Sequence, residues 1–270
     1  MSAVVIIGFA VAVVLWWAST GAILVAVRLA ERGGAKAGLR ATVIGLPLLG
    51  LGAWAFLESL GMTSLTGVYL AFLGILALWG WVELSFLTGT VTGPHPEACP
   101  PHAPGWERLI RAWSTIAYHE IVLTILFAFV VLASLAAENM VGCWTYLILY
   151  FARISAKLNL FLGVRYINTE FLPRHLAHLG SHFRIAKMNW LFPLSVTALT
   201  FALAYWFERL SAATSQADQA GFALLAGLTA LALLEHWLLV LPLPDAKLWR
   251  WMLPAPRHTS TTRQPEEKTS

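Results

Sequence analysis

Seven stretches of this 270-residue chain are each long and apolar enough to form a membrane-spanning helix. A helix needs about 20 mainly apolar residues to cross the hydrocarbon core of a bilayer. The stretches cover residues 3–27, 41–60, 65–88, 115–136, 140–161, 190–209 and 220–242. Only 12% of the residues are charged, about half the share in a typical soluble domain. The sequence therefore predicts an all-α, polytopic membrane protein, a seven-transmembrane-helix bundle. It excludes a disordered chain, an ordinary cytosolic enzyme and a nucleic-acid-binding module.

The basic residues predict the orientation of this bundle. With seven spans the connecting loops alternate between the two sides of the membrane. Seventeen of the eighteen Lys and Arg residues fall on one side, in residues 28–40, 89–114, 153–189 and 242–270. Because basic loops stay in the cytoplasm, we expect a periplasmic N-terminus and a cytoplasmic C-terminus. The transmembrane domain would cover residues 1–242, followed by a cytoplasmic tail, 243–270, whose last part we expect to be disordered.

Seven ionisable residues inside the predicted spans lie near the cytoplasmic side. They are Glu83, His119, Glu120, Arg153, Lys157, Glu235 and His236. Carboxylates and imidazoles are suitable ligands for Fe, Mn or Zn, so this group could be a buried metal or cofactor site. Two other interpretations stay open. The residues could form a structural ion-pair network, or they could lie in the hydrated headgroup zone.

A second candidate site lies in the cytoplasmic connection 153–189, where we expect an interfacial helix between spans five and six. Pro173 suits the first turn of such a helix. On an α-helix His175, His178 and His182 would share one face, as in the histidine boxes of membrane di-metal enzymes. The alternative is an amphipathic helix that lies on the membrane surface without a metal.

Three segments of the chain resemble a known family. They are KLNLFLGV at 157–164, EFLP at 170–173 and MNWLFP at 188–193. With the seven hydrophobic stretches and the pairs His119-Glu120 and Glu235-His236, they resemble the PuhE family, the photosynthetic complex assembly protein 2 of anoxygenic phototrophic bacteria. The resemblance covers the chain up to its polar tail. It implies the bacterial inner membrane, in its photosynthetic or intracytoplasmic part.

The resemblance implies a role in assembling the photosynthetic reaction centre and light-harvesting complex, or in governing bacteriochlorophyll supply to it. Partners would be the lipid bilayer, reaction-centre or light-harvesting subunits, or pigment-biosynthesis proteins. A bound bacteriochlorophyll would need one His ligand for its Mg and an apolar slot.

The alternative is a membrane metalloenzyme that acts on a lipophilic pigment precursor. Its Fe, Mn or Zn ligands would come from Glu83, His119, Glu120, His175, His178, His182, Glu235 and His236. Arg153 and Lys157 would bind a propionate or phosphate of the substrate. A transporter is disfavoured, because the polar groups lie near one face rather than at the midplane.

Overall fold

The computed structural model describes residues 2–34, 36–167, 169 and 172–242. The polar tail 243–270 and the motif residues Glu170 and Phe171 lie outside the described residues. The described part is all-helical, and its only extended pairing is an isolated bridge between Val164 and Ile185. The prediction of an all-α protein is therefore confirmed.

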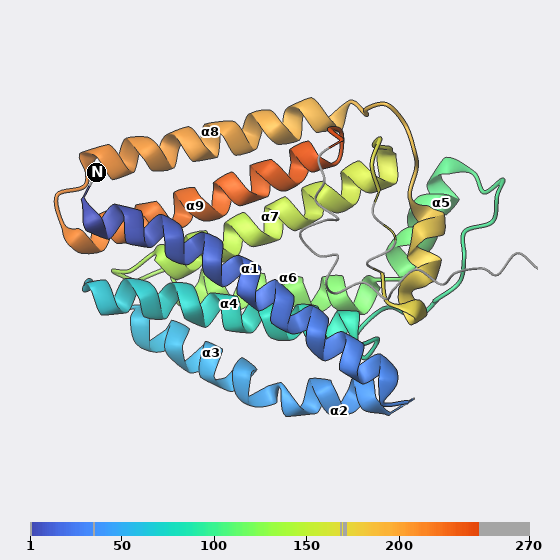
Figure 1. Ribbon diagram of the computed structural model, residues 1–270, viewed down its shortest axis with the longest axis horizontal. Helices are drawn as coiled ribbons and strands as arrows, with labels where there is room; N and C mark the ends of the chain where they lie inside the picture. Colours follow the sequence, from blue (N-terminus) through green and yellow to red (C-terminus); the bar gives the residue numbers. More distant parts are fainter. Residues whose placement is uncertain (1, 35, 168, 170–171, 243–270) are drawn as a thin grey trace, which may run out of the picture.

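All seven predicted stretches are helical, although the ends differ by a few residues. The elements are α1 (Ala3–Arg32), α2 (Ala37–Ile44), α3 (Leu46–Ser59), α4 (Leu65–Leu87), α5 (Gly105–Ser114), α6 (Ala117–Ala133), α7 (Val141–Leu162), the 3-10 helix η2 (Arg174–His182), α8 (Leu191–Ala212) and α9 (Gln216–Leu238). The long helices run side by side as a bundle, and α5 and η2 cross one end of it (Figure 1). We call this the α5 end of the bundle.

By length and composition, five of the described helical segments could cross a membrane: α1, α2 with α3, α4, α8 and α9. A sixth is possible if the bent pair α5 and α6 counts as one span. The helix α7 is not among them, and it is less apolar because it carries Arg153 and Lys157. The structure thus supports several membrane-spanning helices.

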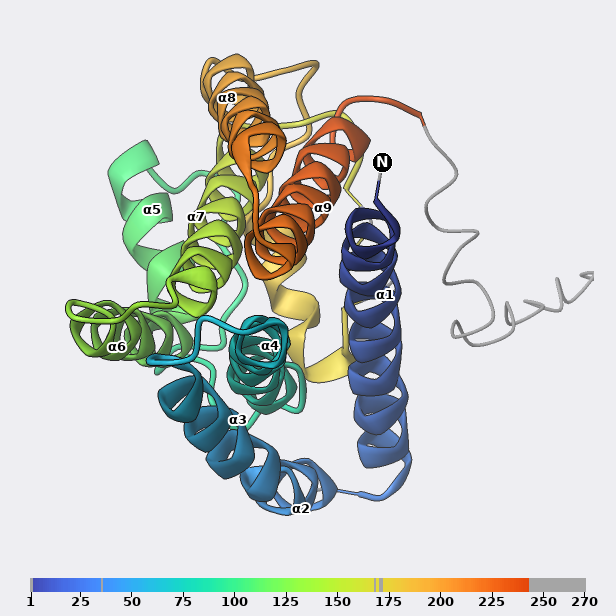
Figure 2. The same ribbon diagram turned by 90° about the vertical axis from the view of Figure 1, so that its left-hand side faces the viewer.

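The helix α4 forms the centre of the bundle. It contacts α1, α2, α3, α6, α7 and α9, which surround it in Figure 2. Phe72, Ile75 and Leu78 of α4 are fully or almost fully buried, together with Tyr146 of α7 and Leu224 of α9. Because α4 is apolar all round, it can be enclosed in this way.

Glycines allow α3 and α4 to approach closely. A Cβ atom built on Gly74 of α4 would lie 2.7 Å from the backbone N of Phe56 and 2.9 Å from the backbone O of Gly52, both on α3. Any larger residue at this crossing would force the two helices apart. By contrast, a Cβ atom on Gly50, also in α3, meets nothing within 4 Å.

Two predicted features differ in the structure. The predicted α-helix with His175, His178 and His182 on one face is wrong, because the segment is the 3-10 helix η2. With 3.0 residues per turn His175 and His178 align, whereas His182 is a third of a turn away. In addition, the amphipathic helix α5 precedes the predicted fourth span and is bent by 70° from α6.

We predict that Gly74→Ala lowers the free energy of unfolding by about 1–3 kcal/mol, because the added methyl overpacks the contact with α3. The matched control Gly50→Ala should leave it unchanged or raise it, since alanine favours helix and the site is open. Thermal unfolding of the detergent-solubilised protein measures both. Equal midpoints of thermal unfolding for the two variants would contradict the close packing of α3 against α4 at Gly74.

Candidate functional site

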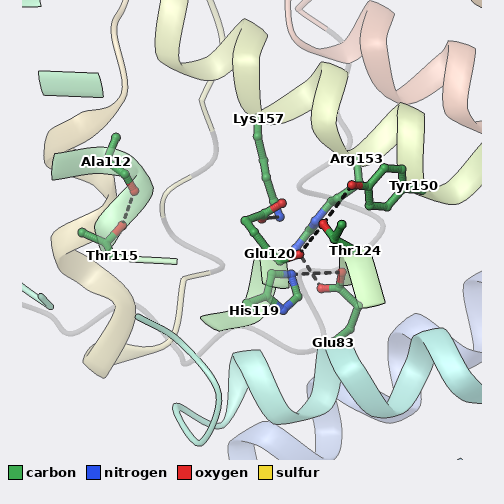
Figure 3. Close-up of polar contacts among 9 residues, drawn as sticks. All are labelled: Glu83, Ala112, Thr115, His119, Glu120, Thr124, Tyr150, Arg153 and Lys157. Carbon is green, nitrogen blue, oxygen red and sulfur yellow. Dashed lines mark hydrogen bonds and ion pairs between the residues drawn. The ribbon is translucent and has the colours of Figure 1, made fainter. Parts of the chain in front are cut away.

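Two partly buried ion pairs join three helices at the α5 end of the bundle. Arg153 of α7 donates from Nη2 to Oε2 of Glu83 on α4 over 2.8 Å, and Lys157 of α7 donates to Glu120 on α6. The two cations are one helical turn apart on α7, so they share one face (Figure 3). Together with His119 these residues form the charged cluster.

The start of α6 is held in place by the loop that follows α4. The N–H of His119 donates to the backbone O of Thr92 over 3.0 Å. Gly93 lies so close to the junction of α5 and α6 that a Cβ atom would be 2.1 Å from the backbone O of Ser114. Only glycine fits there. The loop and the bend between α5 and α6 therefore set the direction in which His119 and Glu120 point.

His119 is the residue of the charged cluster whose ring has no hydrogen bond. Its side chain is fully buried, and its ring lies 4.3 Å from that of Phe86, centroid to centroid. Its Nε2 is 3.9 Å from Oε1 of Glu83, too far for a hydrogen bond. Among the described residues neither ring nitrogen has a partner, and Oε1 of Glu83 has none either. Burying a polar atom without a hydrogen-bond partner costs about 1–3 kcal/mol of stability. The ion pairs therefore do not explain why the ring of His119 and Oε1 of Glu83 are buried here.

Glu235 and His236 at the end of α9 point to different neighbours. Oε1 of Glu235 accepts a hydrogen bond from Nε1 of Trp16 on α1 over 3.0 Å. His236 is buried, and its Nδ1 is 2.8 Å from the backbone O of Ala232, which can only accept. Nδ1 therefore carries a proton and donates, and Nε2 lies within hydrogen-bonding distance of the hydroxyl of Ser155, at 2.9 Å. These bonds hold the imidazole between α7 and α9.

The three His residues of η2 have three different surroundings. The exposed His175 packs against Gly89 and lines a cleft of about 530 Å³ together with Glu31, Thr88 and Thr90. Nδ1 of His178 donates to the backbone O of His175 over 3.2 Å, and burial lowers the pKa of His178.

His182 is buried, and its Nε2 donates to the backbone O of Glu97 over 3.1 Å. Burial lowers its pKa, the hydrogen bond to Glu97 offsets part of this shift, and the positive charges of Arg108 and Arg111 lower the pKa further. His182 therefore ties η2 to the Pro-rich loop as a neutral side chain.

The structure brings together Glu83, His119, Glu120, Arg153 and Lys157, and it places the other predicted ligands in separate surroundings. In the part of the chain that the structure describes, no group of three or more His, Cys, Asp or Glu residues is placed to hold a metal ion. The two clustered carboxylates are instead held by cations. This arrangement has the form of the ion-pair network that the sequence left open.

A network of buried amides was missed by the sequence analysis. Nδ2 of Asn189 donates to Oδ1 of Asn159 over 3.0 Å and to the backbone O of Gly163 over 2.9 Å. Oδ1 of Asn189 accepts from the N–H groups of Leu191 and Phe192, at the start of α8. Gly163 has a φ of 126°, which favours glycine. The segments 157–164 and 188–193 thus lie together and form the joint between α7 and α8. The sequence feature that could have predicted this joint is an Asn two residues before an apolar helix.

Comparison with known proteins assigns the chain to a family. The DUF3623 family, described as a protein of unknown function, matches residues 1–260. The chain belongs to this family. It is 52% identical over 241 residues to an uncharacterized 30.4 kDa protein in the puhA 5′ region of Rhodobacter capsulatus, which covers 89% of this chain and 88% of that protein. No solved structure matches the chain.

We predict that Arg153→Met lowers the free energy of unfolding by about 1–3 kcal/mol, because it leaves the buried carboxylate of Glu83 without its partly exposed cation. Adding Glu83→Gln should recover part of the loss. The matched control is Arg111→Met, which breaks a partly exposed pair with Glu107 and should cost less than about 1 kcal/mol. Chemical unfolding in detergent measures all three, and a harmless Arg153→Met would contradict the role of the pair.

We predict that acidification loosens the contact between η2 and the Pro-rich loop through His182. Its pKa lies below the ordinary value of about 6.5, so below that pH the unfolded state binds more protons than the folded state. The contribution of neutral His182 to the stability of the folded state is fully present above about pH 6.5 and decreases as the pH drops below that value.

Hydrogen exchange of residues 92–104, measured at pH 7.5 and 5.5 and corrected for intrinsic rates, should show the loss of protection. His182→Gln keeps an N–H donor but cannot titrate, so it should abolish the pH effect, whereas the control His102→Gln should not. An unchanged pH effect in His182→Gln would refute the assignment.

Proposed function

We propose that this DUF3623 protein is a PuhE protein of the photosynthetic inner membrane. It would assist assembly of the reaction centre and light-harvesting complex, or govern the supply of bacteriochlorophyll to it. The observation that carries the proposal is the 52% identity to a Rhodobacter capsulatus protein named for the puhA 5′ region. The segments at 157–164 and 188–193, which resemble the PuhE family, support it.

The proposed topology has seven spans, a periplasmic N-terminus and a cytoplasmic C-terminus. Five helical segments are long and apolar enough to cross a membrane. We propose α6 and α7 as the two further spans. Both contact α4, and α7 also contacts α8 and α9, so α7 is lined by other bundle helices. Its two cations are paired with carboxylates, which offsets the cost of placing them there. The distribution of Lys and Arg then puts the α5 end in the cytoplasm.

In this proposal the charged cluster fixes the cytoplasmic end of the bundle and does no chemistry. Oε2 of Glu83 and Oε1 of Glu120 are each engaged by a cation from α7, so neither of these two oxygens can act as a metal ligand or base without breaking an ion pair. An assembly factor needs a fixed docking face rather than a reactive group. Paired charges fit that requirement.

A bacteriochlorophyll would need one accessible imidazole beside an apolar wall. The ring of His119 is enclosed by its neighbours, so it offers no room for a macrocycle. His175 is exposed at a cleft whose other wall includes Val27, Ala30 and Leu39. His175 is therefore the imidazole that would ligate Mg in a pigment bound at this end.

The test is to delete the gene of the relative in Rhodobacter capsulatus and to complement it with this chain. We expect near-infrared absorption of the reaction centre and light-harvesting complex in isolated membranes to fall several-fold on deletion and to recover with the wild-type chain. His175→Ala should restore it less than the control His102→Ala if pigment binds at the cleft. Normal absorption in the deletion strain would refute the proposal.

The unpartnered ring of His119 keeps the metalloenzyme as a second candidate. Elemental analysis of the purified protein separates the two. Iron, manganese or zinc near one equivalent per chain, lost on His119→Ala but not on His102→Ala, would favour the enzyme over the assembly factor.

A further inference from the structure

The helix α5 carries an exposed apolar stripe, one edge of which, at Trp106 and Ile110, lines a cleft beside the Pro-rich loop. Trp106, Leu109, Ile110 and Trp113 follow the spacing i, i+3, i+4 and i+7, so they share one face of the helix. Each is at least 48% exposed, although all four are large and apolar. Isolated exposed apolar residues are normal, but a full stripe on one helix marks an interaction surface.

The polar face of α5 is fixed to the bundle. Arg108 donates from Nη2 to the backbone O of Phe161 at the end of α7 over 2.6 Å, and to the backbone O of His182 over 3.1 Å. Its guanidinium also lies 4.4 Å from the centre of the Phe161 ring. Arg108 is nearly opposite the apolar stripe on the helix, so these bonds turn the stripe away from the bundle.

The direction of α5 fits a membrane surface. It is bent by 70° from α6, so if α6 crosses the bilayer, α5 runs nearly along its plane. Figures 1 and 2 show it beside the last turns of α7, at the outside of the bundle. Tyr118 in the first turn of α6 and Leu158 in the last turns of α7 are exposed as well.

We propose that α5 lies in the membrane–water interface of the bilayer that holds the bundle, with Trp106, Leu109, Ile110 and Trp113 inserted between the headgroups. This inference rests on the proposed topology, in which α6 crosses the membrane. Tryptophan is enriched at that depth because one edge of its ring is polar. Arg111 is paired with Glu107, and Arg108 is bound to backbone oxygens, so insertion depends on apolar contact and not on anionic lipid.

The test is a nitroxide scan of the full-length protein in vesicles of uncharged phosphatidylcholine. Single cysteines replace Trp106, Glu107, Leu109, Ile110 and Arg111 in a Cys99→Ser background, in which the buried Cys143 is retained. Each label is scored by its accessibility to oxygen, which concentrates in the bilayer, and to a water-soluble nickel chelate. Ile125→Cys on α6, which is 62% exposed, reports whether that helix is in the bilayer.

We expect labels at 106, 109 and 110 to have an oxygen-to-nickel ratio several-fold above that at 107 and 111, at a depth of about 5–10 Å. Higher nickel access at the stripe, with 125 still in the bilayer, would overturn the interfacial helix and leave the topology intact. Low access to both reagents at the stripe would also overturn it, because protein would then cover α5. Nickel access at 125 would instead refute the topology.

Discussion

Two cations on one turn of α7 hold the α5 end of this bundle together. Arg153 binds Glu83 of α4, and Lys157 binds Glu120 of α6, so a single helix face connects three helices. Charges are costly in an apolar bundle unless they are paired. Each pair therefore fixes the rotation of two helices at once. The first turn of α6, and with it His119, takes its position from these pairs and from the loop that passes through Gly93.

Other polar contacts at the same end of the bundle also join helices. His236 connects α9 to Ser155 of α7, and Asn189 connects the start of α8 to Asn159 of α7. Two of the segments that resemble the PuhE family, 157–164 and 188–193, thus have a structural role, because they form the joint between α7 and α8. His119 is the exception, since its ring is buried without a partner among the described residues.

The α5 end presents a different surface from the rest of the molecule. It combines the cleft at His175, the charged cluster and the apolar stripe of α5, whereas the opposite end has short connections. In the proposed topology this end faces the cytoplasm at the membrane surface. An assembly factor that binds membrane-embedded subunits or pigment would do so with this end, which would lie at the same depth in the membrane as its partners. The stripe would set that depth, and the ion pairs would keep the face rigid.

Local information in the sequence was enough for the long apolar helices and for the ionisable residues at one end of the bundle, but not for α5 or for the amides Asn159 and Asn189. Apolar runs of about 20 residues predict helices because their length and hydrophobicity are local properties. The pairing of the clustered charges, and the separation of Glu235 from His236, could not be predicted, because they depend on how α1, α4, α6, α7 and α9 pack. The helical type of η2 was also decided by tertiary contacts, since Leu176 and Leu179 pack against Phe86. The sequence determined which ionisable groups lie at one end of the bundle, and the packing of the helices decided which of them meet and which are buried.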